Sequence, residues 1–188
     1  MGSFVFRATH IEGLSRIVPI FSRDRRGYFS KTFEREIFAE HGLCLHVAEE
    51  LETSSSRNTL RGLHFQRRHS QNKLVRVLSG EVYDVAVDLR PESKTFGKWQ
   101  GFTLSAENRE MLYLPKGFAH GFLARQDHTI VHYLCGDRYD PESEDGILWN
   151  DPELAIDWPL DRGMAPSLSA RDQAFQSFAA FRRSIEQE

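Results

Sequence analysis

The sequence predicts an all-β domain, an antiparallel sandwich or barrel built from many short strands. Glycines recur about every ten to twelve residues through the middle of the chain, where they separate short runs of Val, Leu, Phe and Tyr. The segment EVYDVAVDL alternates in side-chain type, as a strand does. A βαβ alternation is absent, and so are the glycine loops GxGxxG and GxxxxGKS/T, which removes support for dinucleotide-binding and P-loop folds.

Length and composition indicate one domain that spans residues 1–188, large enough to bury a substantial core. The net charge of −3 argues against a general binder of nucleic acid or of membrane surfaces. The chain contains no long apolar run and no signal-peptide pattern, so we expect no membrane association. The two cysteines form no CxxC pair, which fits a reducing, cytoplasmic environment.

The clearest expected strand is Glu81–Leu89. Its alternation gives the strand two faces. One face carries Tyr83, Val85, Val87 and Leu89, and the other carries Val82, Asp84, Ala86 and Asp88. The other expected strands, in chain order, are Ile17–Phe21, Leu74–Leu78, Trp99–Leu104, Glu110–Leu114, Gly121–Ala124 and Thr129–Leu134.

A few short helices are expected beside these strands. Phe33–His41 has apolar residues at helical spacing, and Gly42 supplies a stop. The tail from Ser169 to about Ile185 reads as helical, with Ser169 as a possible N-cap. The segment Asp140–Asp161 is rich in Pro, Asp and Trp, so we expect an ordered loop there.

The segment LRGLHFQ at 60–66 places Gly62, His64 and Gln66 on one face of an expected strand. A histidine among apolar neighbours is most often a hydrogen-bonded core residue, so this motif alone does not establish chemistry. Arg61 has the opposite parity from His64. It can serve the same pocket only through a bend at Gly62 or by reaching a neighbouring subunit.

The segment LPKGFAHGF at 114–122 contains P-x-G-x-x-H, which is similar to the second half of the cupin signature. Metal cupins carry three strong ligands, but here the first half offers His64 and Gln66 with His120, which is a poor set. We therefore expect no metal. Tyr133 in VHYLCGDRY could be a packing residue with its hydroxyl at the rim. Asp172, near a helix start, could be a cap or a solvated charge.

Taken together, these residues resemble the dTDP-4-dehydrorhamnose 3,5-epimerase family of sugar-nucleotide enzymes. The segments that carry the resemblance, in chain order, are DRRGYF at 24–29, NTLRGLHFQ at 58–66, KLVRVLSGEVYDVAVDLR at 73–90, SKTFGKW at 93–99, LPKGFAHGF at 114–122 and GILWNDPELAIDWP at 146–159. The resemblance implies a cupin-type jelly roll, a homodimer, and an epimerase that acts on a nucleotide-linked 4-keto-6-deoxy sugar without cofactor or metal.

The resemblance also implies residue roles. His64 would be the catalytic base oriented by Asp172, Lys73 would lie beside the ketone oxygen, and Tyr133 would be the acid on the far face of the sugar. The positions that would bind the sugar nucleotide are Arg26, Lys31, Arg61, Gln66, His120, Glu144 and Arg171, with Tyr139 stacking on the base.

The chemistry accounts for these residue types. A ketone acidifies the protons on the carbons beside it, so epimerisation needs one group to remove a proton and another on the opposite face to return one. The enolate formed in between requires a fixed positive charge near its oxygen, a role that Lys73 fits. The diphosphate explains why an acidic chain would gather Arg26, Arg61 and Arg171.

Two departures from the family pattern suggest a changed ligand. The family commonly has an acidic residue at the position of Lys31, and it usually reads Q-x-N-x-S where this chain reads Glu49-Glu50-Leu51-Glu52-Thr53. These positions line the nucleotide or sugar end in the family. The alternatives left open are epimerisation at one carbon only, ketoisomerisation of a GDP-, CDP- or dTDP-linked hexose or heptose, a sugar-nucleotide-binding jelly roll without turnover, and a metal cupin oxygenase, which Gln66 disfavours.

Overall fold

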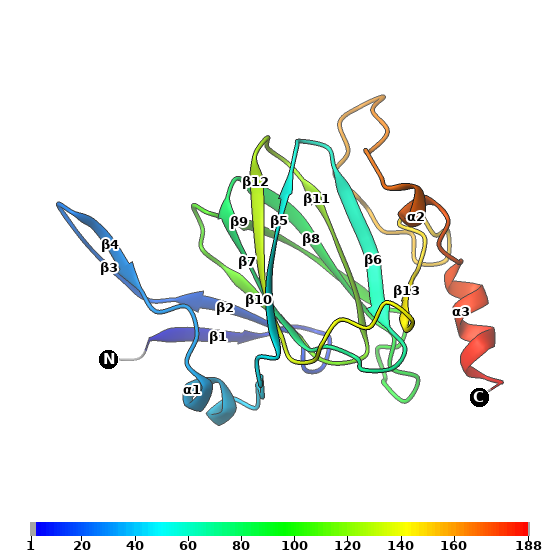
Figure 1. The fold of residues 1–188 in the computed structure, drawn as a ribbon, viewed down its shortest axis with the longest axis horizontal. Coiled ribbons are helices and arrows are strands. Elements are labelled where there is room, and N and C mark those ends of the chain that lie inside the picture. The colour runs from blue at the N-terminus through cyan, green and yellow to red at the C-terminus, as the bar shows by residue number, and fades with distance from the viewer. Residues whose placement is uncertain (1–2, 188) are drawn as a thin grey trace.

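The computed structural model describes residues 3–187. Its centre is two antiparallel sheets packed face to face (Figure 1). One sheet has six strands in the order β1-β2-β10-β7-β12-β5, and the other has five in the order β13-β6-β11-β8-β9. The strands are β1 Phe4–Ala8, β2 Ser15–Pro19, β5 Glu49–Ser55, β6 Leu60–Gln66, β7 Lys73–Ser79, β8 Glu81–Asp88, β9 Trp99–Ser105, β10 Met111–Leu114, β11 Phe118–Ala124, β12 Thr129–Cys135 and β13 Glu144–Gly146. The predicted all-β class and cupin-type jelly roll are confirmed.

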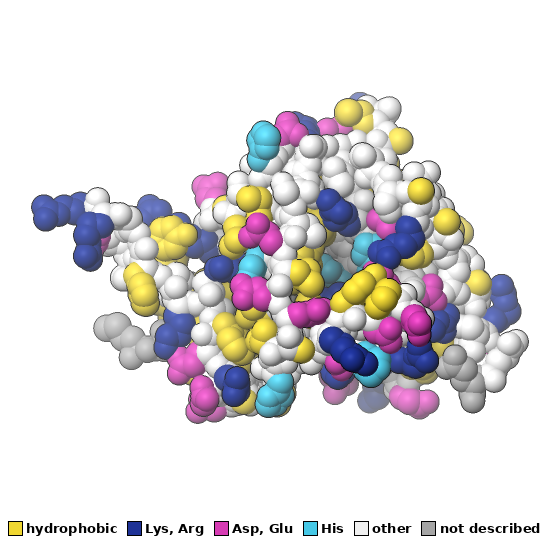
Figure 2. All heavy atoms as spheres, in the orientation of Figure 1, with side chains coloured by type: hydrophobic (Ala, Val, Ile, Leu, Met, Phe, Trp, Pro, Cys, Tyr) yellow, Lys and Arg dark blue, Asp and Glu magenta, His cyan; other side chains and the backbone are white. Residues whose placement is uncertain are grey.

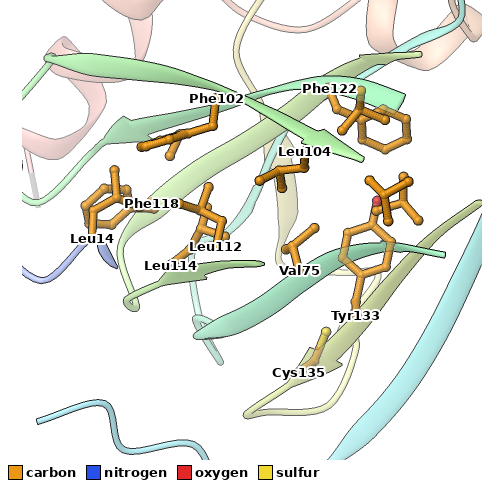
Figure 3. Packing of buried hydrophobic residues seen from close by; sticks show 14 of the residues in the cluster. Leu14, Val75, Phe102, Leu104, Leu112, Leu114, Phe118, Phe122, Tyr133 and Cys135 are labelled. Carbon is orange, nitrogen blue, oxygen red and sulfur yellow. The ribbon is translucent and has the colours of Figure 1, made fainter. Parts of the chain in front are cut away.

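The alternation along β8 separates two apolar cores. Val82 and Ala86 point between the sheets, into a fully buried cluster that includes Phe102 and Phe122 (Figure 3). Val85 and Val87 point outward, where the C-terminal part of the chain covers them with Trp158 and other apolar side chains. The predicted division of β8 into two faces is therefore confirmed, and both faces are buried because a second layer covers the sheet.

The six-stranded sheet is covered on its outer side near the N-terminus. Helix α1, Arg35–Glu40, inserts the fully buried Phe38 against Phe4, Ile17 and Met111. Gly42 follows the helix with a positive φ, which any residue with a Cβ rarely adopts. The helix predicted over Phe33–His41 is present, shortened at both ends.

Several predicted boundaries are wrong. The expected strand Ile17–Phe21 is divided, because β2 ends at Pro19 and a separate strand β3, Phe21–Asp24, pairs only with β4, Gly27–Ser30. The expected C-terminal helix is two helices, α2 Ala170–Gln173 and α3 Phe178–Ile185. Ser169 is the N-cap of α2, as predicted, since its hydroxyl accepts a hydrogen bond from the N–H of Asp172 at 3.0 Å.

The hairpin β3–β4 projects away from the two packed sheets (Figure 1). Tyr28 and Phe29 are 58% and 74% exposed, and every residue of β3 is exposed as well. No helix within residues 3–187 combines the length and apolar composition that crossing a membrane requires.

Candidate active site

A cavity of about 320 Å³ lies between the two sheets and opens to solvent. Figure 2 shows the hollow, with histidine side chains inside it and charged side chains around its edge. The lining residues are Glu49, Leu51, Thr53, Arg61, His64, Phe65, Gln66, Gln71, Lys73, His120, Gly121, Phe122, Tyr133, Cys135, Tyr139, Glu144 and Arg171. A second hollow of about 480 Å³ shares Arg61, His64 and Arg171 with it, so the two are neighbours along one path.

His64 lies on β6 and is oriented by a carboxylate from the C-terminal tail. Its Nε2 hydrogen bonds to Asp172 Oδ1 at 2.9 Å. Asp172 Oδ2 accepts the backbone N–H of Gly62 at 3.3 Å. Burial alone would raise the pKa of Asp172, but the hydrogen bonds from His64 and Gly62 lower it below its ordinary value. The carboxylate is therefore ionised at neutral pH and holds the imidazole in one orientation.

A bend at Gly62 brings Arg61 and His64 to the same cavity. The register of β11 against β6 shifts between His120 and Phe122, opposite Gly62, and the φ of Gly62 is +124°. A Cβ at this position would lie 2.5 Å from the Cα of Gly121, so only glycine fits. Of the two routes predicted for Arg61, the bend at Gly62 is the one observed within this chain.

A second histidine–carboxylate pair lies deeper. His120 on β11 contacts both carboxylate oxygens of Asp84 on β8 through Nε2, each at 2.9 Å. Both residues are buried. The ring of His120 meets the ring of Tyr133 edge-on, with centroids 6.0 Å apart. His120 therefore forms a buried part of the cavity wall, held in place by Asp84.

Lys73 and Tyr133 come from the opposite sheet, on β7 and β12. Figure 3 shows Tyr133 extending from β12 toward the sheet that carries Phe122. Burial raises the pKa of the Tyr133 phenol, because the phenolate loses its hydration, so the group stays protonated. Burial lowers the pKa of the Lys73 ammonium, and nearby negative groups oppose that shift. The imidazole of His64 and the phenol of Tyr133 thus line one cavity from opposite sheets, with the ammonium of Lys73 on the phenol's side.

At the mouth, a cluster links the tail to β13. Arg171 donates from Nη1 and Nη2 to the two carboxylate oxygens of Glu144, at 2.5 and 2.9 Å. The hydroxyl of Tyr139 donates to the same carboxylate. Burial would raise the pKa of Glu144, but the bonds from Arg171 and Tyr139 lower it below its ordinary value. The mouth therefore carries an exposed aromatic ring and a guanidinium in fixed positions.

Comparison with known proteins agrees with this geometry. Residues 8–180 match the family model for dTDP-4-dehydrorhamnose 3,5-epimerase. The chain is 51% identical to the enzyme of that name from Methanothermobacter thermautotrophicus, over 86% of this chain and 87% of the relative. The chain belongs to the dTDP-4-dehydrorhamnose 3,5-epimerase family. It is accordingly an isomerase of the sugar-nucleotide epimerase type.

Two solved structures of family members are similar throughout. One is the 3,5-epimerase RmlC of Legionella pneumophila in complex with dTDP-4-keto-L-rhamnose, with a TM-score of 0.92 and 40% identity over 97% of this chain and 96% of that one. The other is ChmJ, a 3'-monoepimerase of Streptomyces bikiniensis in complex with dTDP-quinovose, with a TM-score of 0.88 and 33% identity over 94% and 89%. The same fold thus serves family members described as acting at two positions and at one.

Gln66, predicted to bind the substrate, lines the cavity and also bonds to neighbouring loops. Its Nε2 donates to the carbonyl oxygens of His69 and Arg138, and Oε1 accepts the N–H of Asp140. All three bonds hold loops, so Gln66 shapes the wall and keeps only one acceptor site, on Oε1, for a ligand. Within residues 3–187, no group of three His, Cys, Asp or Glu side chains converges in a way that could hold a metal ion.

Arg26 and Lys31 lie outside the cavity of their own chain. Arg26 is at the tip of the hairpin, where its guanidinium pairs with Asp24 at 2.6 Å and its side chain is 85% exposed. Lys31 follows β4 and pairs with Glu34. The residues at 49–53, which differ from the family pattern, point to two faces of β5. Glu49, Leu51 and Thr53 line the cavity, as expected, whereas Glu50 and Glu52 point to the opposite face of β5.

Three contacts were not foreseen. Asp84 could have been found from its place in a strand of Val and Ala, because a buried carboxylate needs a partner. Phe175, which meets the ring of His64 edge-on at 5.5 Å, has no sequence signal. Thr53 Oγ1 is buried beside the phenol of Tyr133, and this contact depends on the pairing of β5 with β12.

Proposed function

We propose that the protein inverts C3 and C5 of a dTDP-linked 4-keto-6-deoxy hexose, in the biosynthesis of a rhamnose-type sugar. The observation that carries the proposal is the placement of His64 and Tyr133 on opposite sheets around one cavity, with Lys73 beside them. A sugar ring held in the cavity would present one face to the imidazole and the other to the phenol. That is the geometry an epimerase needs, because a proton must leave one face and return to the other.

His64 is the base in this proposal. Its Nε2–H is held by Asp172, so Nδ1 takes the proton from the carbon next to the ketone. The carboxylate stabilises the imidazolium that forms. Because His64 is partly exposed, with 26% of its side chain accessible, the proton it receives can later be lost to water.

Lys73 stabilises the enolate. Removal of the proton places negative charge on the C4 oxygen, and an ammonium already fixed beside it needs no reorganisation. The phenol of Tyr133 then donates its proton to the opposite face of the same carbon, and the phenolate regains a proton from solvent in the cavity before the next inversion. The sequence of steps is repeated at the second carbon, and each inversion replaces one carbon-bound hydrogen with one from solvent.

The nucleotide end lies toward the mouth of the cavity. Arg61 and Arg171 line both hollows, so their guanidinium groups suit a diphosphate that runs from one to the other. The exposed ring of Tyr139 offers a face on which a base can stack. His120, whose Nε2 is held by Asp84, lines the cavity, and its Nδ1 is available to accept a hydrogen bond from a sugar hydroxyl.

We further propose that the enzyme is a homodimer. The hairpin β3–β4 carries Arg26 away from its own cavity and exposes Phe21, Tyr28 and Phe29. Docking of this hairpin on a second copy would bury those rings and bring Arg26 toward the partner's phosphate site. Mixing inactive Arg26→Ala and His64→Ala proteins tests this, because one site of each mixed dimer is intact. Recovered activity is expected, and a monomer by sedimentation, or no recovery, contradicts the homodimer.

The enzyme is proposed to work in the cytoplasm, where its two cysteines, one exposed and one buried, remain reduced. Cell fractionation of a tagged protein tests this, and recovery from an extracytoplasmic fraction would contradict it.

Deuterium exchange tests the reaction. Incubation of the substrate with the enzyme in D₂O should add two deuterium atoms, counted by mass spectrometry and assigned to C3 and C5 by NMR. The His64→Ala variant should add none. One deuterium at one carbon would show a single-position epimerase, the activity described for ChmJ, and binding without exchange would contradict the proposed catalysis.

A further inference from the structure

Three cavity residues lie side by side on the six-stranded sheet. Cys135 of β12 is paired with Lys73 of β7 on one side and with Glu49 of β5 on the other. All three line the cavity, so Lys73 and Glu49 have side chains on the same face of the sheet, separated by the small side chain of Cys135. None of the roles proposed above uses Glu49.

The spacing allows the two charges to face each other. Adjacent strands are about 4.8 Å apart, so the backbones of Lys73 and Glu49 are separated by about 10 Å. The thiol between them is short, and burial raises its pKa to about 11, so it is neutral at pH 7. The carboxylate of Glu49 is also fixed in place, because Gln71 Nε2 donates to its Oε1 at 2.8 Å and to the carbonyl oxygen of Asp137 at 2.6 Å.

Lys73 needs a nearby negative charge, because its burial lowers the pKa of its ammonium. An uncharged amine would not stabilise an enolate. On β10, the other neighbour of β7, the residue opposite Lys73 is the uncharged Leu114. The titratable and charged groups that line the cavity with Lys73, or act on it electrostatically, are Glu49 from β5, His64 and Arg61 from β6, Asp84 from β8, His120 from β11, Tyr133 and Cys135 from β12, Tyr139 from the following loop, Glu144 from β13 and Arg171 from α2.

The three carboxylates in this set differ in what they bind. Glu144 is bound through both oxygens by the guanidinium of Arg171. Asp84 is bound through both oxygens by His120. Glu49 is bound by the neutral amide of Gln71, and within residues 3–187 no cation lies within ion-pair distance of it. Glu144 raises the pKa of Lys73 more than Glu49 does, but its charge is also paired with Arg171, whereas Glu49 has no cationic partner of its own in the described part of the chain.

We propose that Glu49 is a positioning residue that keeps the Lys73 ammonium charged, so that it remains ready to stabilise the enolate oxygen. This inference rests on the proposed epimerase function and deepens it. Strand parity makes Glu49 distinct from its neighbour, since Glu50 points to the other face of β5 and binds His132.

The decisive variant is Glu49→Gln, which keeps the size of the side chain and a polar partner for Gln71 but removes the charge. Loss of an anion lowers the pKa of Lys73 further, so the basic limb of the kcat profile should move to lower pH by about one unit. At a pH above that limb, kcat should fall by up to about tenfold, while kcat at neutral pH and KM change by less than about twofold.

The matched control is Glu50→Gln, which makes the same charge change on the same strand but outside the cavity, and it should leave the profile of the wild-type enzyme unchanged. Glu49→Asp retains the charge, so its pH profile should lie close to that of the wild-type enzyme. Identical pH profiles for Glu49→Gln and Glu50→Gln in an active enzyme would overturn the role of Glu49 and leave the epimerase function standing.

A second measurement needs no substrate. In protein labelled with ¹³C-lysine, the Cε resonance of Lys73, assigned by its loss in Lys73→Gln, should titrate at lower pH in Glu49→Gln than in wild type or Glu50→Gln. Equal titration in the three proteins would overturn the inference even if the wild-type enzyme exchanged no deuterium, a result that would separately contradict the proposed function.

Discussion

The two histidine–carboxylate pairs of this protein have the same chemistry but different surroundings. His64–Asp172 and His120–Asp84 each have an Nε2-to-oxygen distance of 2.9 Å. The side chains of the first pair are 26% and 5% exposed, and those of the second are 6% and 0% exposed. The first joins a strand to the C-terminal tail, and the second joins two adjacent strands inside the sandwich.

This difference assigns the roles. A catalytic base must meet both the substrate and, in the next step, a proton acceptor, so it needs partial access to solvent. A buried pair has little access to substrate or to a proton acceptor. It is fixed by packing, so it can orient a ligand and support the sheet. The comparison therefore predicts that the outer pair mainly determines rate and the inner pair mainly determines stability.

The largest expected effect is on the rate. Asp172→Asn should lower kcat by about 10³–10⁴-fold, because an amide neither holds the His64 tautomer nor stabilises its imidazolium. Deuterium exchange measured under single turnover checks this. Asp84→Asn should lower kcat much less, and an equal loss in both variants would contradict the division of roles.

The next effect is on stability. His120→Ala should destabilise the fold by about 3–5 kcal/mol, because it leaves the fully buried carboxylate of Asp84 without its partner. His64→Ala should cost about 1 kcal/mol, since Asp172 keeps its bond from the Gly62 N–H. Urea unfolding of both variants measures the difference, and similar midpoints would show that burial does not separate the pairs.

A smaller effect concerns the ring that supports the outer histidine. Phe175→Leu removes the edge contact with His64, worth about 0.5–1.5 kcal/mol, and should lower kcat by about two- to tenfold. KM should stay close to that of wild type, because Phe175 does not line the cavity. A change confined to KM would place Phe175 in substrate binding instead.

The smallest effect is on the acid dependence of stability. The pKa of Asp172 is lowered in the folded state, so its contribution is present above the unfolded value of about 3.9 and is lost as pH falls through the folded value. The difference in Tm between wild type and Asp172→Asn should therefore shrink as the solution is acidified below about pH 4. A constant difference between about pH 3 and pH 7 would contradict this linkage.

Local pattern predicted most of the central strands but not the segments whose structure depends on distant partners. The side chains of β8 alternate between its two faces, with Val82 on one and Val85 on the other, so this strand could be predicted from the sequence alone. Glu49–Ser55 is polar and became a strand only because β12 pairs with it. The tail was predicted as one helix, but it breaks between α2 and α3, where Gln176 binds Leu148 and Asp151 accepts the N–H of Phe178.

The site shows the same limit. His64, Lys73, Tyr133 and Asp172 were named from motifs, yet the sequence could not say that β6 and β12 would place them around one cavity. Parity placed Arg61 away from His64, and only the bend at Gly62 reverses that. Arg26 and Lys31 were expected at the site and lie outside the cavity of their own chain.

By itself, the sequence determined which side chains are available and which face of each regular strand they occupy, because alternation is a local property of the backbone. The tertiary structure decided which of two similar histidines meets solvent, and that Glu49 rather than Glu50 faces Lys73. Exposure and the distance between charges depend on strands and a tail far apart in the chain, so they exist only once both sheets and the tail have packed.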